Sequence, residues 1–329
     1  MKKNLCQMIT LAHKNPFHLI IVWTMTIRDK FGKLERKISI TADPGLSVSY
    51  LFAIRVRIVA EWFFKLLQTL VYRRKALRGT RLARRMHAGQ EALVIGNGPS
   101  AAKLDWETVA AEQKNGLQVF AINYFPLSEA SEICNPNYIV LSDPLTKPNV
   151  VTNSRVQQLW GKVRQIPSIT LIVPISWFPI IQADSELSTR ALYFDDSGLE
   201  GWTKNISPLK PRGYIPLTAY KALAFANYLG FQRINIIGID NSMFRTVAVD
   251  TENRLIQYPN HFFEKGAVTT DISYFYPAGI NDYFRDMSLC FGSLASYFVG
   301  LPIVNLDGES LVDCFPKDTS SQLLSLKGI

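Results

Sequence analysis

The sequence predicts an α/β protein whose core is a Rossmann-like, mostly parallel β-sheet with helices on both faces. From residue 89 onward, short apolar runs alternate with helix-like segments, and the first apolar run leads directly into a glycine-rich loop. The 329 residues are 47% hydrophobic and 19% charged, a balance typical of a packed globular protein. We expect a basic, amphipathic helical region over residues 1–88, the sheet over 89–250, and a smaller C-terminal lid or subdomain over 251–329.

Short apolar runs predict the buried strands of this sheet. Parallel strands that are covered on both faces read as continuous runs of Val, Ile and Leu, because neither side-chain direction points to water. The runs span residues 91–95, 119–122, 138–141, 169–173 and 234–237.

Two helices have recognisable ends. One is expected to begin after Ser100. The other is expected over Thr218 to Tyr228 and to end at Gly230, because glycine tolerates the left-handed backbone that terminates many helices. Between the last two apolar runs, residues 195–212 are rich in Gly, Ser, Pro and Lys and are expected to form a long loop.

The N-terminal region carries much of the formal net charge of +9. Residues 73–85 contain seven Arg and Lys residues and no acidic residue. The preceding segment, 47–72, is apolar but includes charged residues that make a membrane-spanning helix costly, namely Arg55, Arg57, Glu61 and Lys65. Two interpretations stay open: residues 47–85 lie on an anionic membrane surface, or they form a core helix followed by a solvated basic helix.

The compartment is expected to be the cytoplasm. The apolar run 17–27 includes His18 and Thr24 and is followed by no clear small-residue cleavage site, so we expect no secretory signal. The cysteines at positions 6, 134, 290 and 314 have neither metal-type spacing nor the density of a disulfide framework, and they are expected to be reduced.

The loop Gly96-Asn97-Gly98-Pro99-Ser100 follows the first predicted strand and precedes a predicted helix. Glycines allow close backbone approach, and a helix N-terminus offers N–H groups to a phosphate, so this arrangement favours an anion site. The pattern is neither the Walker motif nor the full dinucleotide fingerprint, and a tight structural turn is the alternative.

Two later apolar runs are also followed by polar residues, Asn123 and Asp143. Ligands of open α/β sheets bind at the carboxyl edge of the strands, so these side chains are expected to converge on the first loop. The alternative is that Asn123 and Asp143 only cap turns.

These features resemble a known family. The Gly-Asn-Gly-Pro-Ser loop, Asn123, the Asp143-Pro144 pair and the block from Leu229 to Asp240 occur in the same order in bacterial sialyltransferases that use CMP-sialic acid. The resemblance covers roughly residues 91 to 275 and extends to motility-associated flagellin glycosyltransferases and pterin diphosphokinase-like proteins.

The resemblance implies a donor site for a nucleotide-linked sugar. Asn97, Gly98 and Ser100 would line the phosphate and ribose, Asn123 would meet the nucleotide or leaving phosphate, and Asp143 stands where the family has an Asn. Thr218 and Ala219 would match a Ser-Gly pair at a helix start. The complete predicted donor set is Gly96, Asn97, Gly98, Pro99, Ser100, Asn123, Asp143, Thr218, Ala219 and Asp240.

The catalytic part of the family pattern is altered. Asn241 and Ser242 stand where the sialyltransferases have tyrosines, and the family's catalytic His aligns near Glu264 or Lys265. His261 is therefore the candidate base, with Glu264 as a substitute if its aromatic neighbours raise its pKa, and with a purely structural histidine as the alternative. His13, His18 and His87 lie in the N-terminal region.

Cations are expected to stabilise the leaving phosphate, and we name Arg212, Arg245 and Lys265. No metal site and no cofactor are predicted. The pair Asp195-Asp196 lacks the Asp-any-Asp spacing of metal-dependent glycosyltransferases and is expected to be a solvated turn.

The expected function is an inverting, metal-independent transfer of a sugar, of sialic-acid type by resemblance, from a nucleotide such as CMP to a lipid-linked or cell-surface glycan. The enzyme would be attached peripherally to the inner membrane. Two alternatives stay open: a magnesium-dependent diphosphokinase-like phosphotransferase, and a non-catalytic nucleotide- or glycan-binding protein of the same fold. Nucleic acid is not an expected partner, because the cations lie beside apolar residues and match no nucleic-acid-reading motif.

Overall fold

The computed structural model describes residues 48–148, 153–200, 202–258, 261–263, 269–276 and 279–325. The chain divides into two compact units, Met1–Phe64 and Lys65–Ile329. Helix α3 (Val48–Thr69) begins in the first unit and ends in the second. Among the described residues, no helix is both long and apolar enough to cross a membrane.

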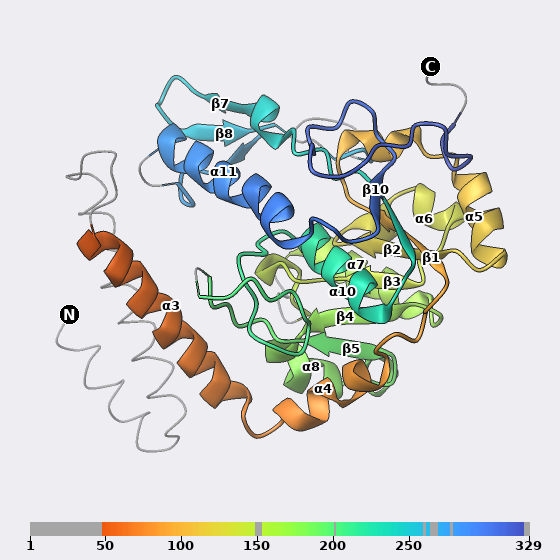
Figure 1. The fold of residues 1–329 in the computed structure, drawn as a ribbon, viewed down its shortest axis with the longest axis horizontal. Helices are drawn as coiled ribbons and strands as arrows, with labels where there is room; N and C mark the ends of the chain where they lie inside the picture. Colours follow the sequence, from red (N-terminus) through yellow and green to blue (C-terminus); the bar gives the residue numbers. More distant parts are fainter. Residues whose placement is uncertain are drawn as a thin grey trace. The chain divides into compact units, whose positions relative to one another are not determined.

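A seven-stranded sheet forms the centre of the second unit, and every pair of neighbouring strands is parallel (Figure 1). The strand order is β10-β6-β1-β2-β3-β4-β5. The bounds are β1 Glu91–Ile95, β2 Gln118–Ile122, β3 Tyr138–Val140, β4 Thr170–Pro174, β5 Ala191–Phe194, β6 Arg233–Ile237 and β10 Ile303–Asn305. The predicted fold class and all the predicted strands are confirmed; β5 and β10 were not predicted.

Helices cover both faces of the sheet. Alternate residues of β1 belong to different cores, Leu93 and Ile95 to one and Ala92 and Val94 to the other. The first core includes residues of α5 (Trp106–Lys114), α7 (Ser154–Gln165) and α8 (Phe178–Gln182). The second core includes residues of α10 (Thr218–Leu229) and α11 (Ile280–Tyr297). The short helices are α6 Ala130–Ile133 and α9 Ser185–Ser188.

The two predicted helices differ in outcome. Helix α10 is confirmed, and Gly230 ends it with a φ of 91°. The segment after Ser100 instead forms a short 3-10 helix, η1 (Pro99–Lys103), and the α-helix α5 starts only after Asp105, whose carboxylate accepts a hydrogen bond from Thr108 N–H. The other 3-10 helices are η2 Phe125–Leu127, η3 Pro144–Thr146, η4 Ile175–Trp177 and η5 Met243–Thr246.

Helix α4 (Arg73–Leu82) runs along the edge strand β5. The Thr80 hydroxyl donates to Tyr193 O at 2.7 Å and accepts from Tyr193 N–H at 3.0 Å, so one side chain satisfies two backbone groups of the edge. Because these two backbone groups of Tyr193 are already bonded, they cannot pair with a strand of another chain. The expected boundary at residue 88 therefore falls inside the second unit, because α4 already belongs to it.

A small antiparallel sheet of β7 (Val247–Val249), β8 (Leu255–Gln257) and β9 (Thr270–Asp271) lies beside α11 (Figure 1). Leu255 and Ile272 form a separate small core with Tyr283 and Met287 of α11. The rest of the C-terminal segment supplies β10, which pairs with β6 in the main sheet. The expected boundary after residue 250 thus also lies within one compact unit.

Candidate functional site

A cavity of about 1600 Å³ opens at the carboxyl ends of the parallel strands. The chain orders β1 to β5 in one direction and places β6 and β10 on the other side of β1, so the β1–β6 border is a topological switch point. Open α/β sheets bind ligands at such a point. The lining comes from the segments that follow β1, β2, β3, β4 and β6 and from the start of α10.

The glycine-rich loop after β1 packs against the loop after β6. A Cβ added to Gly96 would lie 2.1 Å from Gly238 O, and one added to Gly98 would lie 2.4 Å from an Asp240 carboxylate oxygen. Gly96 N–H donates to Ile237 O at 2.8 Å and Gly98 N–H donates to Gly238 O at 2.9 Å. The glycines are therefore required because the two loops approach so closely that a side chain would overlap Gly238 O or the Asp240 carboxylate.

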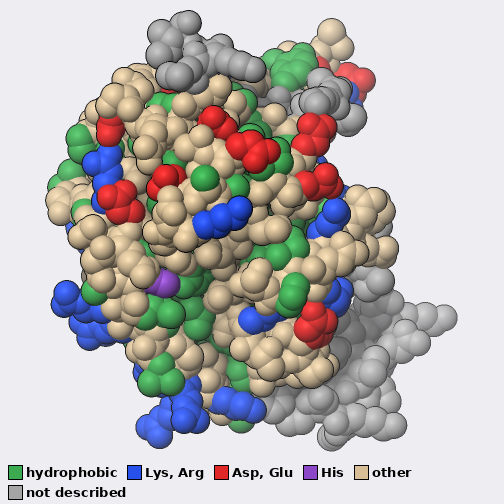
Figure 2. Space-filling model, turned by 90° about the vertical axis from the view of Figure 1, so that its right-hand side faces the viewer, with side chains coloured by type: hydrophobic (Ala, Val, Ile, Leu, Met, Phe, Trp, Pro, Cys, Tyr) green, Lys and Arg blue, Asp and Glu red, His purple; other side chains and the backbone are tan. Residues whose placement is uncertain are grey.

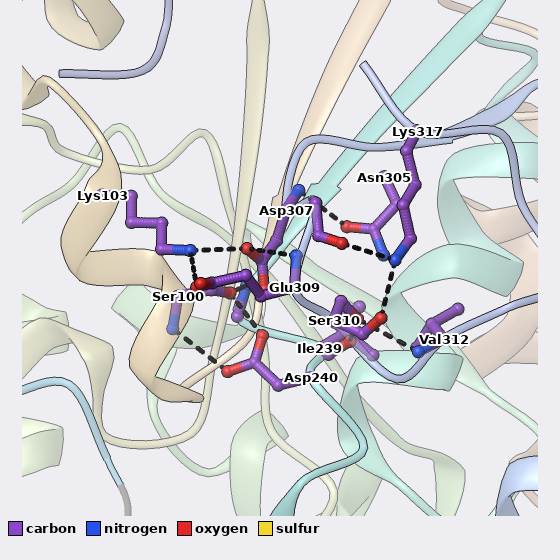
Figure 3. A network of polar contacts seen from close by, with 12 residues as sticks. Ser100, Lys103, Ile239, Asp240, Asn305, Asp307, Glu309, Ser310, Val312 and Lys317 are labelled. Carbon is purple, nitrogen blue, oxygen red and sulfur yellow. Dashed lines mark hydrogen bonds and ion pairs between the residues drawn. The ribbon is translucent and has the colours of Figure 1, made fainter. Parts of the chain in front are cut away.

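Ser100 is bonded to Asp240, and both side chains are buried (Figure 3). Its N–H donates to Asp240 Oδ2 at 3.1 Å, its hydroxyl donates to Asp240 Oδ1, and the same hydroxyl accepts from Gly238 N–H at 2.8 Å. Burial raises the pKa of the Asp240 carboxyl, and the bonds from Ser100 oppose that effect. The sequence pattern predicted that this loop offers its N–H groups to a phosphate. The N–H groups of Gly96, Gly98 and Ser100 instead donate to acceptors within the protein.

The segment after β10 supports the Ser100–Asp240 contact by hydrogen-bonding with the loop after β6 (Figure 3). Leu311 N–H donates to Asp240 O at 3.1 Å, and the Ser310 hydroxyl donates to Ile239 O at 3.2 Å. Lys103 at the end of η1 forms ion pairs with Asp307 at 2.7 Å and Glu309 at 2.6 Å. The three loops after β1, β6 and β10 are thus held in one polar network, which fixes one wall of the cavity.

Two asparagines place oxygen atoms without partners at the cavity. Asn97 follows β1 and is only 6% exposed, and Asn123 follows β2 with a left-handed φ of 47°. Both residues line the cavity, and in the described part of the chain the buried Oδ1 atom of each accepts no hydrogen bond. A buried acceptor without a partner is costly, so these two atoms suit hydroxyl or amino donors of a ligand.

The start of α10 forms a second, electropositive part of the lining. Thr218 and Ala219 line the cavity, and the Thr218 hydroxyl hydrogen-bonds with the Ser142 hydroxyl at 2.7 Å. No side chain of the described residues caps the first turn. The uncapped N–H groups of a helix N-terminus attract anions.

Lys221, one turn further along α10, was not predicted. Its Nζ donates to Pro216 O at 2.9 Å in the cavity wall. Desolvation, and next the nearby Arg212 guanidinium, lower the pKa of Lys221 to about 7. The signal in the sequence was a lone charge in the otherwise uncharged helix Thr218–Leu229, since an isolated lysine on a packed helix usually has a specific role.

Two further cations, Arg212 and Lys65, line the cavity, and each already donates hydrogen bonds within the protein. Arg212 donates to Glu200 Oε1 at 3.2 Å and to Gly213 O at 3.1 Å, while its buried Nε donates to no described residue. Lys65 donates to Asp196 O at 2.8 Å. Arg245, in η5, is not among the lining residues, and Lys265 lies outside the described residues.

The pair Asp195-Asp196 is not a solvated turn. Asp195 is 2% exposed, accepts two hydrogen bonds from Ser197 and forms an ion pair with Arg73. Asp196 lines the cavity and lies 3.5 Å from Lys65 Nζ. The expectation failed because Arg73 and Lys65, more than a hundred residues away in sequence, supply the charges that allow Asp195 to be buried and Asp196 to be half-buried.

An aromatic platform follows Asn123 directly. The Arg155 guanidinium lies 4.4 Å from the centre of the Tyr124 ring, and both residues line the cavity. Burial raises the pKa of the Tyr124 hydroxyl, so this group is neutral near neutral pH. The sequence signal was an aromatic residue directly after a predicted strand end.

His261 is exposed and lines the cavity, with its ring stacked on Phe263 at a centroid distance of 5.5 Å. Glu264, the substitute base, lies outside the described residues. Gly96, Pro99 and Ser100 are absent from the described lining. The predicted residues that the structure does bring together there are Asn97, Gly98, Asn123, Asp143, Arg212, Thr218, Ala219, Asp240 and His261.

Comparison with protein-family models finds no match for this chain, and comparison with curated proteins finds none. Among solved structures, the chain is similar to the MAf glycosyltransferase from Magnetospirillum magneticum AMB-1, with 15% sequence identity and a TM-score of 0.40. The similarity covers 78% of this chain and 39% of that chain, so the present protein spans well under two thirds of its neighbour's length.

Proposed function

We propose that this protein is a glycosyltransferase that uses a nucleotide-linked sugar as its donor. The observation that carries the proposal is a combination of two features in one cavity: two buried asparagine oxygens that have no partner among the described residues, and a helix start that no described side chain caps, with basic side chains nearby. Such a cavity suits a ligand that carries both hydroxyl or amino donors and a phosphate. A nucleotide sugar combines these groups.

The polar groups of the cavity support separate roles for its two parts. Asn97 and Asn123 accept hydrogen bonds from ribose hydroxyls or a base amino group, and Tyr124 with Arg155 offers a face for stacking. The phosphate lies at the start of α10, within reach of Arg212 and Lys221. The resemblance to CMP-sialic acid enzymes favours a CMP-linked donor with an acidic sugar.

In the proposed reaction, a hydroxyl of the acceptor attacks the anomeric carbon of the donor. The bond between that carbon and the phosphate oxygen breaks, the nucleotide leaves with the bonding electrons, and His261 takes the hydroxyl proton. The attack inverts the anomeric centre. Arg212 and Lys221 stabilise the charge that develops on the leaving phosphate, so the step needs no metal ion. We propose a lipid-linked or surface glycan as the acceptor.

A magnesium-dependent phosphotransferase is the second candidate, because Asp143, Asp196 and Asp240 all line the same cavity. The structure weakens this candidate in one respect. The Asp240 carboxylate accepts from Ser100, Asp143 Oδ1 accepts from Leu145 N–H at 2.9 Å, and Asp196 pairs with Lys65 at 3.5 Å, so all three carboxylates are engaged by the protein.

The test is nucleotide release from CMP-sugars by the purified full chain, with and without a chelator. We expect release that the chelator does not inhibit and that His261→Asn lowers by about a hundredfold or more while CMP binding is retained. An unchanged rate in His261→Asn would remove His261 from the mechanism. Turnover of ATP only, with magnesium required, would replace the proposed function by the phosphotransferase.

A further inference from the structure

The outer face of α4 and its flanks combines exposed cations with exposed apolar side chains. Arg74, Lys75, Arg78 and Arg81 on the helix are exposed, as are Arg84 and Arg85 after it. The same stretch also exposes Val71, Leu82 and Met86, which are 89%, 77% and 56% exposed. We call these nine residues the α4 surface.

In the part of the chain that the structure describes, no carboxylate pairs with a cation of this surface. No acidic residue occurs between Glu61 and Glu91 in the sequence. Among described residues, the basic side chains of this stretch that pair with carboxylates are Lys65 and Arg73, which point inward to Asp196 and Asp195. Figure 2 shows one face on which most acidic side chains lie in the upper half and basic side chains reach the lower end.

We propose that the α4 surface docks the protein on an anionic lipid bilayer. Helix geometry places Arg74, Arg78 and Arg81 along one outward stripe of α4, because they follow at intervals of four and three residues. Val71, Leu82 and Met86 flank that stripe and are available to enter the boundary between headgroups and acyl chains. Interfacial binding combines such apolar insertion with attraction between each cation and the anionic leaflet.

A nucleic acid fits this surface less well. Proteins that bind single strands usually interleave cations with aromatic side chains on which bases stack. The α4 surface carries Val, Leu and Met in those places and no aromatic residue. Exposed aliphatic side chains enter a bilayer interface without a cost in free energy, but they add little binding free energy when they contact nucleic-acid bases.

The α4 surface begins beside the cavity. Arg73, the first residue of α4, pairs with Asp195. Asp196, which follows Asp195 in the sequence, lines the cavity together with Lys65. Tyr72 stacks on Phe178 at 5.2 Å, directly after the lining residue Trp177. Docking would therefore hold the cavity close to the bilayer. The benefit of that position rests on the proposed function, in which a lipid-linked acceptor approaches from the membrane.

The first unit has an apolar stripe of its own. On α3, Phe52, Val56, Val59 and Phe63 are exposed and follow at intervals of four, three and four residues, the spacing of one helix face. This stripe is independent of the α4 surface, and the experiment below leaves it unchanged.

The test is co-sedimentation of the full chain with vesicles of phosphatidylethanolamine and phosphatidylglycerol, and with vesicles of phosphatidylcholine alone, in the absence of any donor. We expect binding to the anionic vesicles that weakens with salt. The variant Arg74→Gln, Arg78→Gln, Arg81→Gln should bind them about a hundredfold more weakly. The matched control Lys114→Gln, Lys162→Gln, Lys210→Gln removes the same charge from other elements and should bind like the unmodified protein.

A second variant, Val71→Ser with Leu82→Ser, separates lipid from other polyanions. This variant should lose vesicle binding, whereas its affinity for single-stranded RNA should equal that of the unmodified protein. The proposal is overturned if the unmodified protein does not sediment with anionic vesicles, if the Arg and Lys triple variants behave alike, or if the apolar variant binds vesicles normally. None of these readings requires turnover, so an inactive protein that still binds vesicles would contradict only the proposed function.

Discussion

Asp240 accepts two hydrogen bonds from Ser100, one from the hydroxyl and one from the backbone N–H at 3.1 Å. The two residues are 140 positions apart and join the loops after β1 and β6, the two strands that border the switch point of the sheet. This contact engages the hydroxyl and N–H of Ser100, so they are not available to a phosphate at the start of η1. The glycine-rich loop forms part of the cavity wall, and the proposed function places the phosphate at the start of α10 instead.

Ser100→Ala is expected to destabilise the fold. Hydrogen bonds to buried charged groups contribute about 1.5–3 kcal/mol, and the variant leaves Asp240 Oδ1 without its hydroxyl donor. The free energy of unfolding from urea titration should fall by about that amount. Ser188→Ala is the control, because the Ser188 hydroxyl is exposed and bonds only locally. Equal stability of the two variants would show that the Ser100–Asp240 contact contributes little.

Gly96→Ala should be severely destabilising even without ligand, since the new Cβ would overlap Gly238 O. Overpacking of this kind costs about 1–3 kcal/mol or more. Gly161→Ala makes the same chemical change within α7, where nothing lies within 4 Å of the added Cβ, and should stabilise the helix by up to about 1 kcal/mol. Thermal unfolding of both proteins checks the contrast. A stable Gly96→Ala protein that has lost only ligand binding would restore the phosphate-loop interpretation.

Asn97→Ala should separate binding from stability. Because Asn97 Oδ1 has no hydrogen-bond partner among the described residues, its removal breaks no bond that the structure shows, and the melting temperature should stay equal or rise. Nucleotide affinity should fall by about tenfold, the loss of one hydrogen bond to a ligand. Calorimetric titration beside thermal unfolding measures both. A large loss of stability with unchanged affinity would make Asn97 a structural residue.

Lys221 predicts a pH dependence of nucleotide binding. Its pKa of about 7 means that the side chain is charged below that pH and largely neutral above it. Affinity for CMP should therefore weaken as the pH rises from about 6 to about 8.5, and Lys221→Met should show less of this change. The matched variant Lys210→Met, at an exposed loop position away from the lining, should keep the full dependence.

The same lysine affects stability in a defined direction. Its pKa in the folded protein lies below the unfolded value of about 10.4, so the unfolded chain binds more protons between those two pH values. Folding stability should rise with pH in that window for the unmodified protein relative to Lys221→Met. A constant difference between the two unfolding free energies from about pH 7 to about pH 10 would contradict the lowered pKa.

The central strands and α10 were predictable because their signals are local. Residues 91–95 and 234–237 are apolar runs that become strands buried on both faces, and Gly230 ends α10 as its position indicated. The edge strands β5 and β10 were not predictable. Each has one neighbour in the sheet, is short, and includes partly exposed residues such as Leu192 and Val304, so neither reads as a buried run.

The place of the candidate site in the fold could be predicted from the sequence, but the chemical roles of its residues could not. Asn123 and Asp143 do reach the cavity, because the carboxyl ends of parallel strands converge. The sequence Gly-Asn-Gly-Pro-Ser fits both a phosphate loop and a tight backbone contact, and only the distant Asp240 decides between them. Asp195 was mistaken for a solvated residue for the same reason, since its partner Arg73 lies in another segment.

The most direct test of a nucleotide site is calorimetric titration of the full chain with CMP, CDP, UDP, GDP and ATP, each with and without magnesium, repeated for Asn97→Ala and Asn123→Ala. We expect selective binding of CMP that magnesium does not change and that both variants weaken. Binding of ATP only with magnesium, or binding of no nucleotide by the unmodified protein, would contradict the assignment of this cavity to a CMP-linked donor.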